Sequence, residues 1–275
     1  MARRRPRGRR KVQGGGGARA AWIVALALVL GGAGVAAYAV VAYLGGRPNF
    51  DDATLCPQDG PPAALAVLLD LTDPLGPAQA ARLRTLIDAE VARAPVHAMV
   101  SLGVVSADEA DWGARFARCK PATGDDASLI YENPALIAER FEAEFQAPLS
   151  ATIDAMMAGQ AQDRSPIMES LQALLAQTPL PGEAGDALTI VVVSDLLQHS
   201  DLLSFYRGEG WEAFEASGGT ERLARNLGGA GIVLVRVPRP EAGADARALV
   251  EPFWSRYLDR QGAAAPLREI VLGDL

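Results

Sequence analysis

The longest apolar stretch of this chain covers residues 20–44 and directly follows a basic head over residues 1–19. A helix of 25 residues extends about 37 Å, which is enough to cross a hydrocarbon core of about 30 Å with some tilt. The head carries eight Lys and Arg residues and no acidic residue, and such a flank stays on the cytoplasmic side. The pattern predicts a single-pass protein of an inner or plasma membrane, with its bulk on the periplasmic or extracellular side.

A cleaved signal peptide is the alternative, because it also combines a basic head with an apolar core. Signal-peptide cores usually have about 7 to 15 residues, fewer than this stretch, although Ala37-Tyr38-Ala39 offers a small-residue cleavage pattern. Trp22 and Tyr43 lie near the two ends of the stretch, where aromatic side chains anchor a helix at the membrane interfaces. The length favours a retained signal anchor.

Beyond this helix, residues 45–62 are rich in Gly, Pro, Asp and Asn and are expected to form a linker. Continuous apolar runs bounded by turn residues then predict strands buried on both faces of a parallel sheet, at 63–69, 98–105, 188–193 and 231–237. Helical patterns alternate with them, which indicates an α/β protein with a doubly wound, mostly parallel sheet. We expect one domain over residues 63–275, with an insertion at 108–162.

The helical patterns are apolar stripes with three- and four-residue spacing. They predict helices after Pro77, after the cap Asn133 with Pro134, after Pro166, around Leu223 and Leu227, and over residues 244–257. Pro148 is expected to break or kink the second of these helices. The pair Gly228-Gly229 is expected to end the fourth.

The charge of the chain is divided unevenly. The whole chain has 26 basic and 33 acidic residues, and removing the eight basic residues of the head leaves 18 against 33, or about −15. Phosphate binding needs positive charge, so the outer domain is not expected to bind nucleic acid.

Two cysteines, Cys56 and Cys119, follow the apolar helix. In an oxidising compartment such a pair most often forms a disulfide, here closing a 63-residue loop between the segment after the membrane and a loop at 116–124. Two free buried thiols are the alternative. With only His97 and His199 beside them, the cysteines exclude an iron–sulfur cluster and a histidine-rich zinc site.

Polar side chains follow two of the expected strands. Asp70, Thr72 and Asp73 come after the first run, Asp195 comes after the run 188–193, and Ser165 precedes a helix. If these two strands are neighbours, the five side chains converge at one sheet edge, where ligands bind in open α/β sheets. Carboxylates and hydroxyls are oxygen ligands for a hard cation such as Mg²⁺. The alternative is that Asp73, Ser165 and Asp195 cap helices.

At these positions the chain resembles the von Willebrand factor A family. The metal-ion-dependent adhesion site of that family has an Asp-x-Ser-x-Ser turn after the first strand, a Thr in a later loop, and an Asp after the fourth strand. Asp70 and Thr72 match the first two positions of the turn, and Pro74 stands where the second serine should be. Ser165 fits the loop threonine and Asp195 the final aspartate. One direct ligand of the metal is therefore missing from the turn.

The resemblance covers residues 63–257 and implies a protein-binding or assembly module, not an enzyme, that works through the edge carrying Asp70 and Asp195. The alternative is a membrane-anchored, metal-dependent hydrolase that uses the same carboxylates, with His199 as its acid or base. The chain has no G-x-S-x-G elbow, P-loop or G-x-G-x-x-G fingerprint, which speaks against enzymatic activity.

Partner contacts are predicted from residue type. Tyr206, Arg207 and Trp211 follow the expected edge, and Tyr, Arg and Trp are enriched at interface hot spots. The alternative is that they pack a helix against the sheet. Small residues four apart at 27–31 and 32–36 would allow the membrane helix to pair with a second copy.

Overall fold

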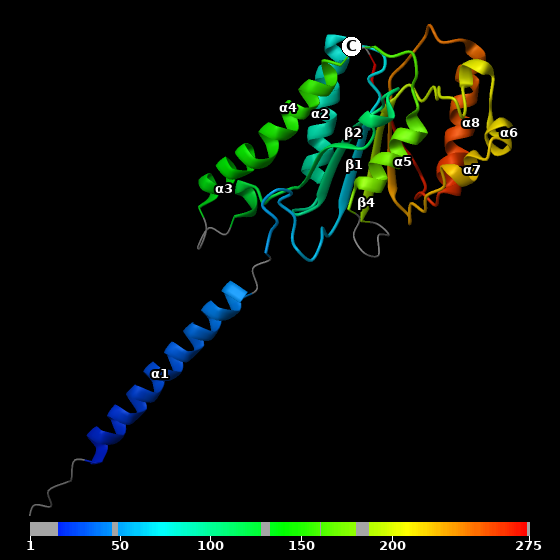
Figure 1. Cartoon of the computed structure of the whole chain (residues 1–275). Helices are drawn as coiled ribbons and strands as arrows, with labels where there is room; N and C mark the ends of the chain where they lie inside the picture. The colour runs from blue at the N-terminus through cyan, green and yellow to red at the C-terminus, as the bar shows by residue number, and fades with distance from the viewer. Residues whose placement is uncertain (1–15, 46–48, 128–132, 160, 180–186, 274–275) are drawn as a thin grey trace, which may run out of the picture. The chain divides into compact units, whose positions relative to one another are not determined.

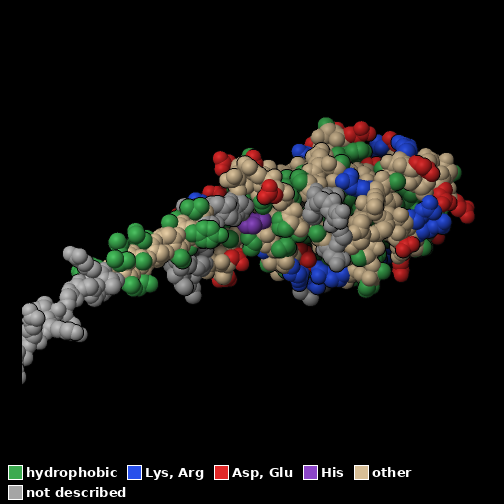
Figure 2. All heavy atoms as spheres, turned by 90° about the horizontal axis from the view of Figure 1, so that it is seen from below, with side chains coloured by type: hydrophobic (Ala, Val, Ile, Leu, Met, Phe, Trp, Pro, Cys, Tyr) green, Lys and Arg blue, Asp and Glu red, His purple; other side chains and the backbone are tan. Residues whose placement is uncertain are grey.

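The computed structural model describes residues 16–45, 49–127, 133–159, 161–179 and 187–273. The chain divides into two compact units, residues 1–48 and residues 49–275. In the first unit, the helix α1 (Gly16–Gly45) contains the expected apolar stretch (Figure 1). Its window Trp22–Val41 carries no charged residue, and apolar side chains cover its surface in Figure 2. Among the described residues, α1 alone is long and apolar enough to span a membrane, a property that signal sequences share.

The second unit is built on a six-stranded sheet with the order β3-β2-β1-β4-β5-β6. Four strands correspond to the four apolar runs, namely β1 (Ala64–Leu69), β2 (Met99–Val104), β4 (Leu188–Ser194) and β5 (Gly231–Arg236). They pair in parallel with one another, and all six residues of β1 are buried. This burial on both faces explains why the runs are continuously apolar. The expected α/β class and mostly parallel sheet are confirmed.

The two outermost strands were not expected from the sequence. β3 (Ala114–Cys119) pairs antiparallel with β2, and β6 (Arg268–Val271) pairs parallel with β5. Both carry charged residues, as edge strands commonly do, and neither shows a continuous apolar run. The expected insertion at 108–162 therefore contains one strand of the sheet itself.

Helices cover both faces of the sheet (Figure 1). One face packs against α2 (Pro77–Arg93) and against α3 (Pro134–Phe141), which leads through a π-helical turn (Glu142–Gln146) into α4 (Ala147–Met157). The other face packs against α5 (Ile167–Gln177), α6 (Trp211–Ala216) and α8 (Ala244–Arg260), with the short α7 (Gly219–Arg222) beside them. Residues of β1 alternate between the two cores.

Two helix predictions need correction. Pro148 does not end its helix, because the chain stays helical from α3 into α4; the α-helical pattern is replaced only by the π-helical turn directly before Pro148, which accommodates the missing N–H. Leu223 and Leu227 do not lie on a helix, since α7 ends at Arg222. Both leucines are buried in the core from an irregular segment, so their spacing reflected burial and not a helix.

The predicted disulfide is present in the structure, between Cys56 and Cys119. Cys119 is the last residue of β3 and not part of a loop, and its backbone N–H donates to the Thr54 carbonyl at 2.7 Å. The second half of the expected 45–62 linker is therefore a folded part of the domain. A bridge between Phe50 and Pro57 closes this segment on itself.

Candidate functional site

The candidate site lies where the strand order reverses. β1 and β4 are parallel neighbours, with Leu69 beside Val193 in register, while the chain continues from β1 to β2 on one side and from β4 to β5 on the other. Such a reversal leaves a crevice outside the carboxyl ends of the two strands, where open α/β sheets bind ligands. Asp70 directly follows β1, and Ser194 ends β4 at this place.

Asp70 is the centre of a buried hydrogen-bond network and is only 6 % exposed. Its Oδ1 accepts from the Thr72 hydroxyl at 2.7 Å and from the Thr72 backbone N–H at 3.3 Å. Its Oδ2 accepts from the Ser165 hydroxyl at 2.9 Å and from the Ser194 hydroxyl at 2.7 Å. A carboxylate has about four acceptor sites, so four donors from three segments satisfy it. Three of the five predicted site residues therefore meet here.

Asp195 forms a second cluster beside this network. Its Oδ1 accepts from the Leu197 backbone N–H at 2.8 Å, and its Oδ2 lies 3.6 Å from Nε of Arg239. The same Nε lies 3.4 Å from Oδ2 of Asp73. These two contacts are ion pairs without hydrogen-bond geometry, since the buried Nε has no hydrogen-bond partner. The guanidinium of Arg239 thus supplies positive charge to two of the predicted carboxylates.

The loop after β4 is strained at Leu196, the residue that follows Asp195. Leu196 has a φ of 65°, in the left-handed region that a bulky side chain rarely adopts. Its N–H donates to the Ser194 hydroxyl at 2.8 Å, and its carbonyl accepts from the Trp254 indole at 2.8 Å. The side-chain oxygen of the buried Gln198 accepts from the backbone N–H of Met168 at 3.0 Å. This hydrogen bond joins the loop to the first turn of α5. Strain of this kind concentrates at functional sites.

The environment of Asp195 disfavours its charged form. Burial, and next the negative charge of Asp70, raise the pKa of Asp195 from 3.8 to about 7. The hydrogen bond from Leu197 and the charge of Arg239 act in the opposite direction without cancelling the rise. Perturbed carboxyl groups at the edge of a sheet are candidates for functional residues.

This rise predicts a stability that falls as the pH increases. Between about pH 4 and pH 7, the folded protein keeps a proton on Asp195 that the unfolded chain has released, so the free energy of unfolding decreases with pH. The loss is absent below about pH 4 and complete above about pH 7, where it amounts to at most about 4 kcal/mol. Asp195→Asn removes the titrating group. The stability of this variant relative to the wild type should therefore be about 2 to 3 kcal/mol higher at pH 8 than at pH 5. Urea unfolding at both pH values measures this gain, and a gain that is equal at both would contradict the assignment.

The alternative, that Asp73, Ser165 and Asp195 cap helices, does not agree with the observed geometry. α2 begins at Pro77 with Gly76 as its cap, so Asp73 does not cap it. Ser165 gives its hydroxyl to Asp70 and not to the first turn of α5. No helix begins at Asp195 within the described stretch 187–273, where residues 195–198 form an irregular loop.

His199 lies next to this edge but is held by neighbouring residues. Its backbone N–H and carbonyl both pair with Ser165 at 2.9 Å, and its Nδ1 is 2.8 Å from the Ser204 hydroxyl. Burial, and then the positive charges of Arg207 and Arg164, lower the pKa of His199. The contact with Ser204 occupies one ring nitrogen and leaves only the other for the acid or base role of the hydrolase alternative.

The three predicted partner residues have different environments. Tyr206 is 54 % exposed and lies edge-on to His199, with ring centres 5.5 Å apart. Burial, and then the charges of Asp195 and Asp73, raise the pKa of Tyr206, which places its hydroxyl in the field of the candidate site. Arg207 is exposed and paired with Glu209. Trp211 is half-buried and packs against aromatic rings of the core, as the alternative interpretation expected.

Sequence reasoning missed two members of the site, Ser194 and Arg239. Ser194 is the last residue of a strand that otherwise reads as apolar. Arg239 follows β5, the next strand in the sheet, so its position at the carboxyl end of that strand was the available signal.

Comparisons of the sequence with protein-family models and with curated proteins give no match. Within the described ranges, no group of three or more His, Cys, Asp or Glu side chains is arranged to hold a metal ion. The chemistry of the site is therefore argued from its own geometry. It offers a polar edge whose segments are joined by hydrogen bonds, with one half-exposed carboxylate, Asp73, and one exposed phenol, Tyr206.

Proposed function

We propose that this chain is a membrane-anchored protein-binding or assembly module, similar to a von Willebrand factor A domain, that faces the extracytoplasmic side. The observation that carries the proposal is the network around Asp70 at the reversal of the strand order. It fixes the backbone of three segments at one edge of the sheet, next to the exposed Tyr206. Rigid, preorganised edges of this kind bind with a low entropic cost.

The meeting of four separated residues supports the likeness to the von Willebrand factor A family. Asp70 and Thr72 after β1, Ser165 before α5 and Asp195 after β4 lie at one edge, as the resemblance implies. Pro74, which replaces a serine of that family's turn, is the departure.

A resident Mg²⁺ fits these residues poorly. Both oxygens of Asp70 already accept hydrogen bonds, and the guanidinium of Arg239 would repel a cation placed between Asp73 and Asp195. We therefore propose binding without a metal, in which Arg239 supplies the positive charge. The alternative is binding through Mg²⁺, for which the hydroxyls of Thr72 and Ser165 are suitable oxygen ligands. EDTA in the binding assay distinguishes the two alternatives, because only metal-dependent binding would be lost.

The location is proposed from α1 and the basic head. Eight basic residues before the span favour a cytoplasmic N-terminus, and the disulfide suits an oxidising compartment. Self-association through small residues at 27–31 and 32–36 is a further proposal for α1, tested by cross-linking the purified protein in detergent.

A reporter fused after Leu275 tests the proposed function at its first requirement. A reporter that works only outside the cytoplasm should be active, and one that works only inside it should be inactive, because the positive flank holds the N-terminus inside. A reporter active only in the cytoplasm would overturn the proposal. A mature chain that starts near Val40 would instead identify the apolar stretch as a cleaved signal peptide. Binding at the edge predicts, in addition, that a photo-crosslinker in place of Tyr206 captures a protein in native membranes.

A further inference from the structure

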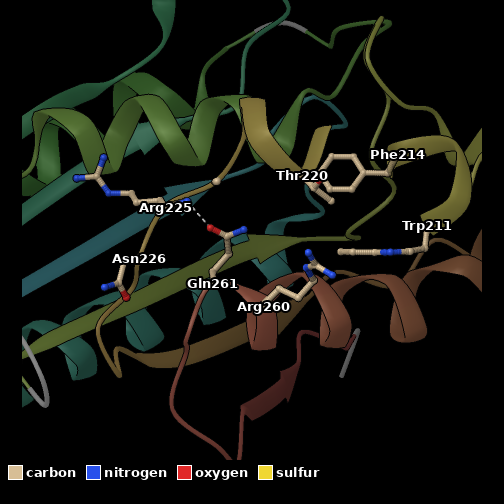
Figure 3. Close-up of a pocket in the computed structure, with 8 residues that line it drawn as sticks. Trp211, Phe214, Thr220, Arg225, Asn226, Arg260 and Gln261 are labelled. Carbon is tan, nitrogen blue, oxygen red and sulfur yellow. Dashed lines mark hydrogen bonds between the residues drawn. The ribbon is translucent and has the colours of Figure 1, made fainter. Parts of the chain in front are cut away.

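A cavity of about 270 Å³ lies between α6, α7 and the last turn of α8, outside the site described above (Figure 3). It lies near the amino end of β5, away from the carboxyl ends of the strands that carry the first site, because the segment before β5 and the residue that follows α8 line it. Its aromatic wall is formed by Trp211 and Phe214, whose ring centres are 5.5 Å apart. Gly219 allows this close packing, since a Cβ there would lie 2.1 Å from the Phe214 ring.

The polar lining of the cavity consists mainly of donors. Of the side chains that line it, Arg225 and Arg260 are cationic and none is acidic, although the domain as a whole carries more acidic than basic residues. Arg225 is engaged, because its Nη2 donates to the Leu175 carbonyl at 2.7 Å. Arg260 is exposed, and its nearest acidic partner, Glu215, is 3.8 Å away. Arg260 therefore has donors left for a ligand.

Gln261 adds a second donor. This side chain is 8 % exposed, and its Oε1 accepts from the backbone N–H of Arg225. In Figure 3 that bond is drawn as a dashed line, and the amide nitrogen points the other way, towards the space beside Arg260 and Trp211. The guanidinium carbon of Arg260 lies 5.7 Å from the centre of the Trp211 ring. One guanidinium and one amide N–H thus converge next to an aromatic wall.

We propose that this cavity binds a carboxylate that is joined to a small apolar group. A planar anion with two oxygens matches the fork of one guanidinium and the neighbouring amide donor, and the apolar group packs on Trp211 and Phe214. A phosphate carries more charge than the one available arginine neutralises, and the cavity is too small for a nucleotide. A small organic acid and the C-terminal residue of a peptide share this chemistry.

Calorimetric titration of the full-length protein in dodecyl maltoside, at low salt, tests the proposal. The ligands are phenylacetate and the peptide acetyl-Gly-Gly-Phe with either a free carboxylate or a C-terminal amide. At least one carboxylate should bind saturably, and if the free peptide binds, its amide should bind at least tenfold more weakly. Binding of phenylacetate alone assigns the site to small acids, and tighter binding of the free peptide assigns it to C-termini.

Three variants locate the binding. Arg260→Gln should weaken it at least tenfold, whereas the matched control Arg222→Gln, which removes a charge from an exposed residue outside the cavity, should leave it unchanged. Ala224→Tyr fills the cavity mouth from an exposed position and should abolish binding without disturbing the core. Absence of binding by every ligand at 10 mM (about the weakest affinity of interest), equal binding of amide and carboxylate, or equal losses in the two arginine variants would overturn the proposal. None of these results bears on the Asp70 edge.

Discussion

Asp70→Ala should lower the free energy of unfolding by about 3 to 5 kcal/mol, because it leaves several buried donors without an acceptor. The hydroxyls of Thr72, Ser165 and Ser194 all donate to this carboxylate, and their residues are at most 8 % exposed. Urea unfolding of the purified protein measures the change. Partner binding should be lost as well, since the three segments that form the edge are then no longer held together.

Asp73→Ala is the matched control, because it removes a carboxylate of the same loop whose side chain is 52 % exposed. The only ion pair found for Asp73 among the described residues is with Arg239, so the change in unfolding free energy should stay within about 1 kcal/mol. Equal losses of stability in the two variants would show that the network around Asp70 has no special role.

Removal of the disulfide should have an effect of similar size. The bond between Cys56 and Cys119 closes a loop of 63 residues, which corresponds to about 4 kcal/mol on the chain-entropy model. It also fastens the segment that follows α1 in sequence to the edge strand β3. The double variant Cys56→Ala/Cys119→Ala should therefore unfold at a clearly lower urea concentration than the oxidised wild type.

Reduction of the wild type provides the control for this comparison. Dithiothreitol should lower the stability of the wild type to nearly that of the double variant, and it should leave the double variant unchanged. A wild type whose unfolding is insensitive to the reductant, at a concentration that alkylation shows to be sufficient, would contradict the predicted contribution.

The central strands were predictable because burial on both faces leaves a continuous apolar run. β1, β2, β4 and β5 each show such a run, and each lies in the middle of the sheet. β3 and β6 could not be recognised in this way, since an edge strand exposes part of its surface and tolerates charged residues. The helix around Leu223 and Leu227 was wrong because buried leucines four residues apart also occur in irregular segments.

The candidate site was predictable from a single geometric rule. Asp70 and Asp195 each follow a strand, and parallel neighbours end at the same edge, so their proximity needed only the correct strand order. The position of Arg239 after β5 indicated the same edge, but its contacts with Asp73 and Asp195 depend on the path of the loop after β5, which the sequence pattern does not define. The sequence predicted a cation site, which stays a prediction, and the structure places the guanidinium of Arg239 beside two of its five residues.

Three aspartates, Asp70, Asp73 and Asp195, share one edge of the sheet with the guanidinium of Arg239. Burial is the first cause of the raised pKa of Asp195, the negative charges of Asp70 and Asp73 add to it, and the positive charge of Arg239 acts against it. The residual negative charge favours a partner surface that carries basic side chains. Such a partner would complete the neutralisation that Arg239 begins.

Photo-crosslinking in native membranes tests most directly whether this edge is the working surface. A photoreactive amino acid replaces Tyr206, which is 54 % exposed beside the site, or Leu136 of α3, which is 57 % exposed on a helix that covers the other face of the sheet. The account predicts a protein adduct at position 206 that persists in EDTA, disappears in the Asp70→Ala background and is absent at position 136. Adducts at position 136 alone, or equal adducts with and without Asp70, would contradict it.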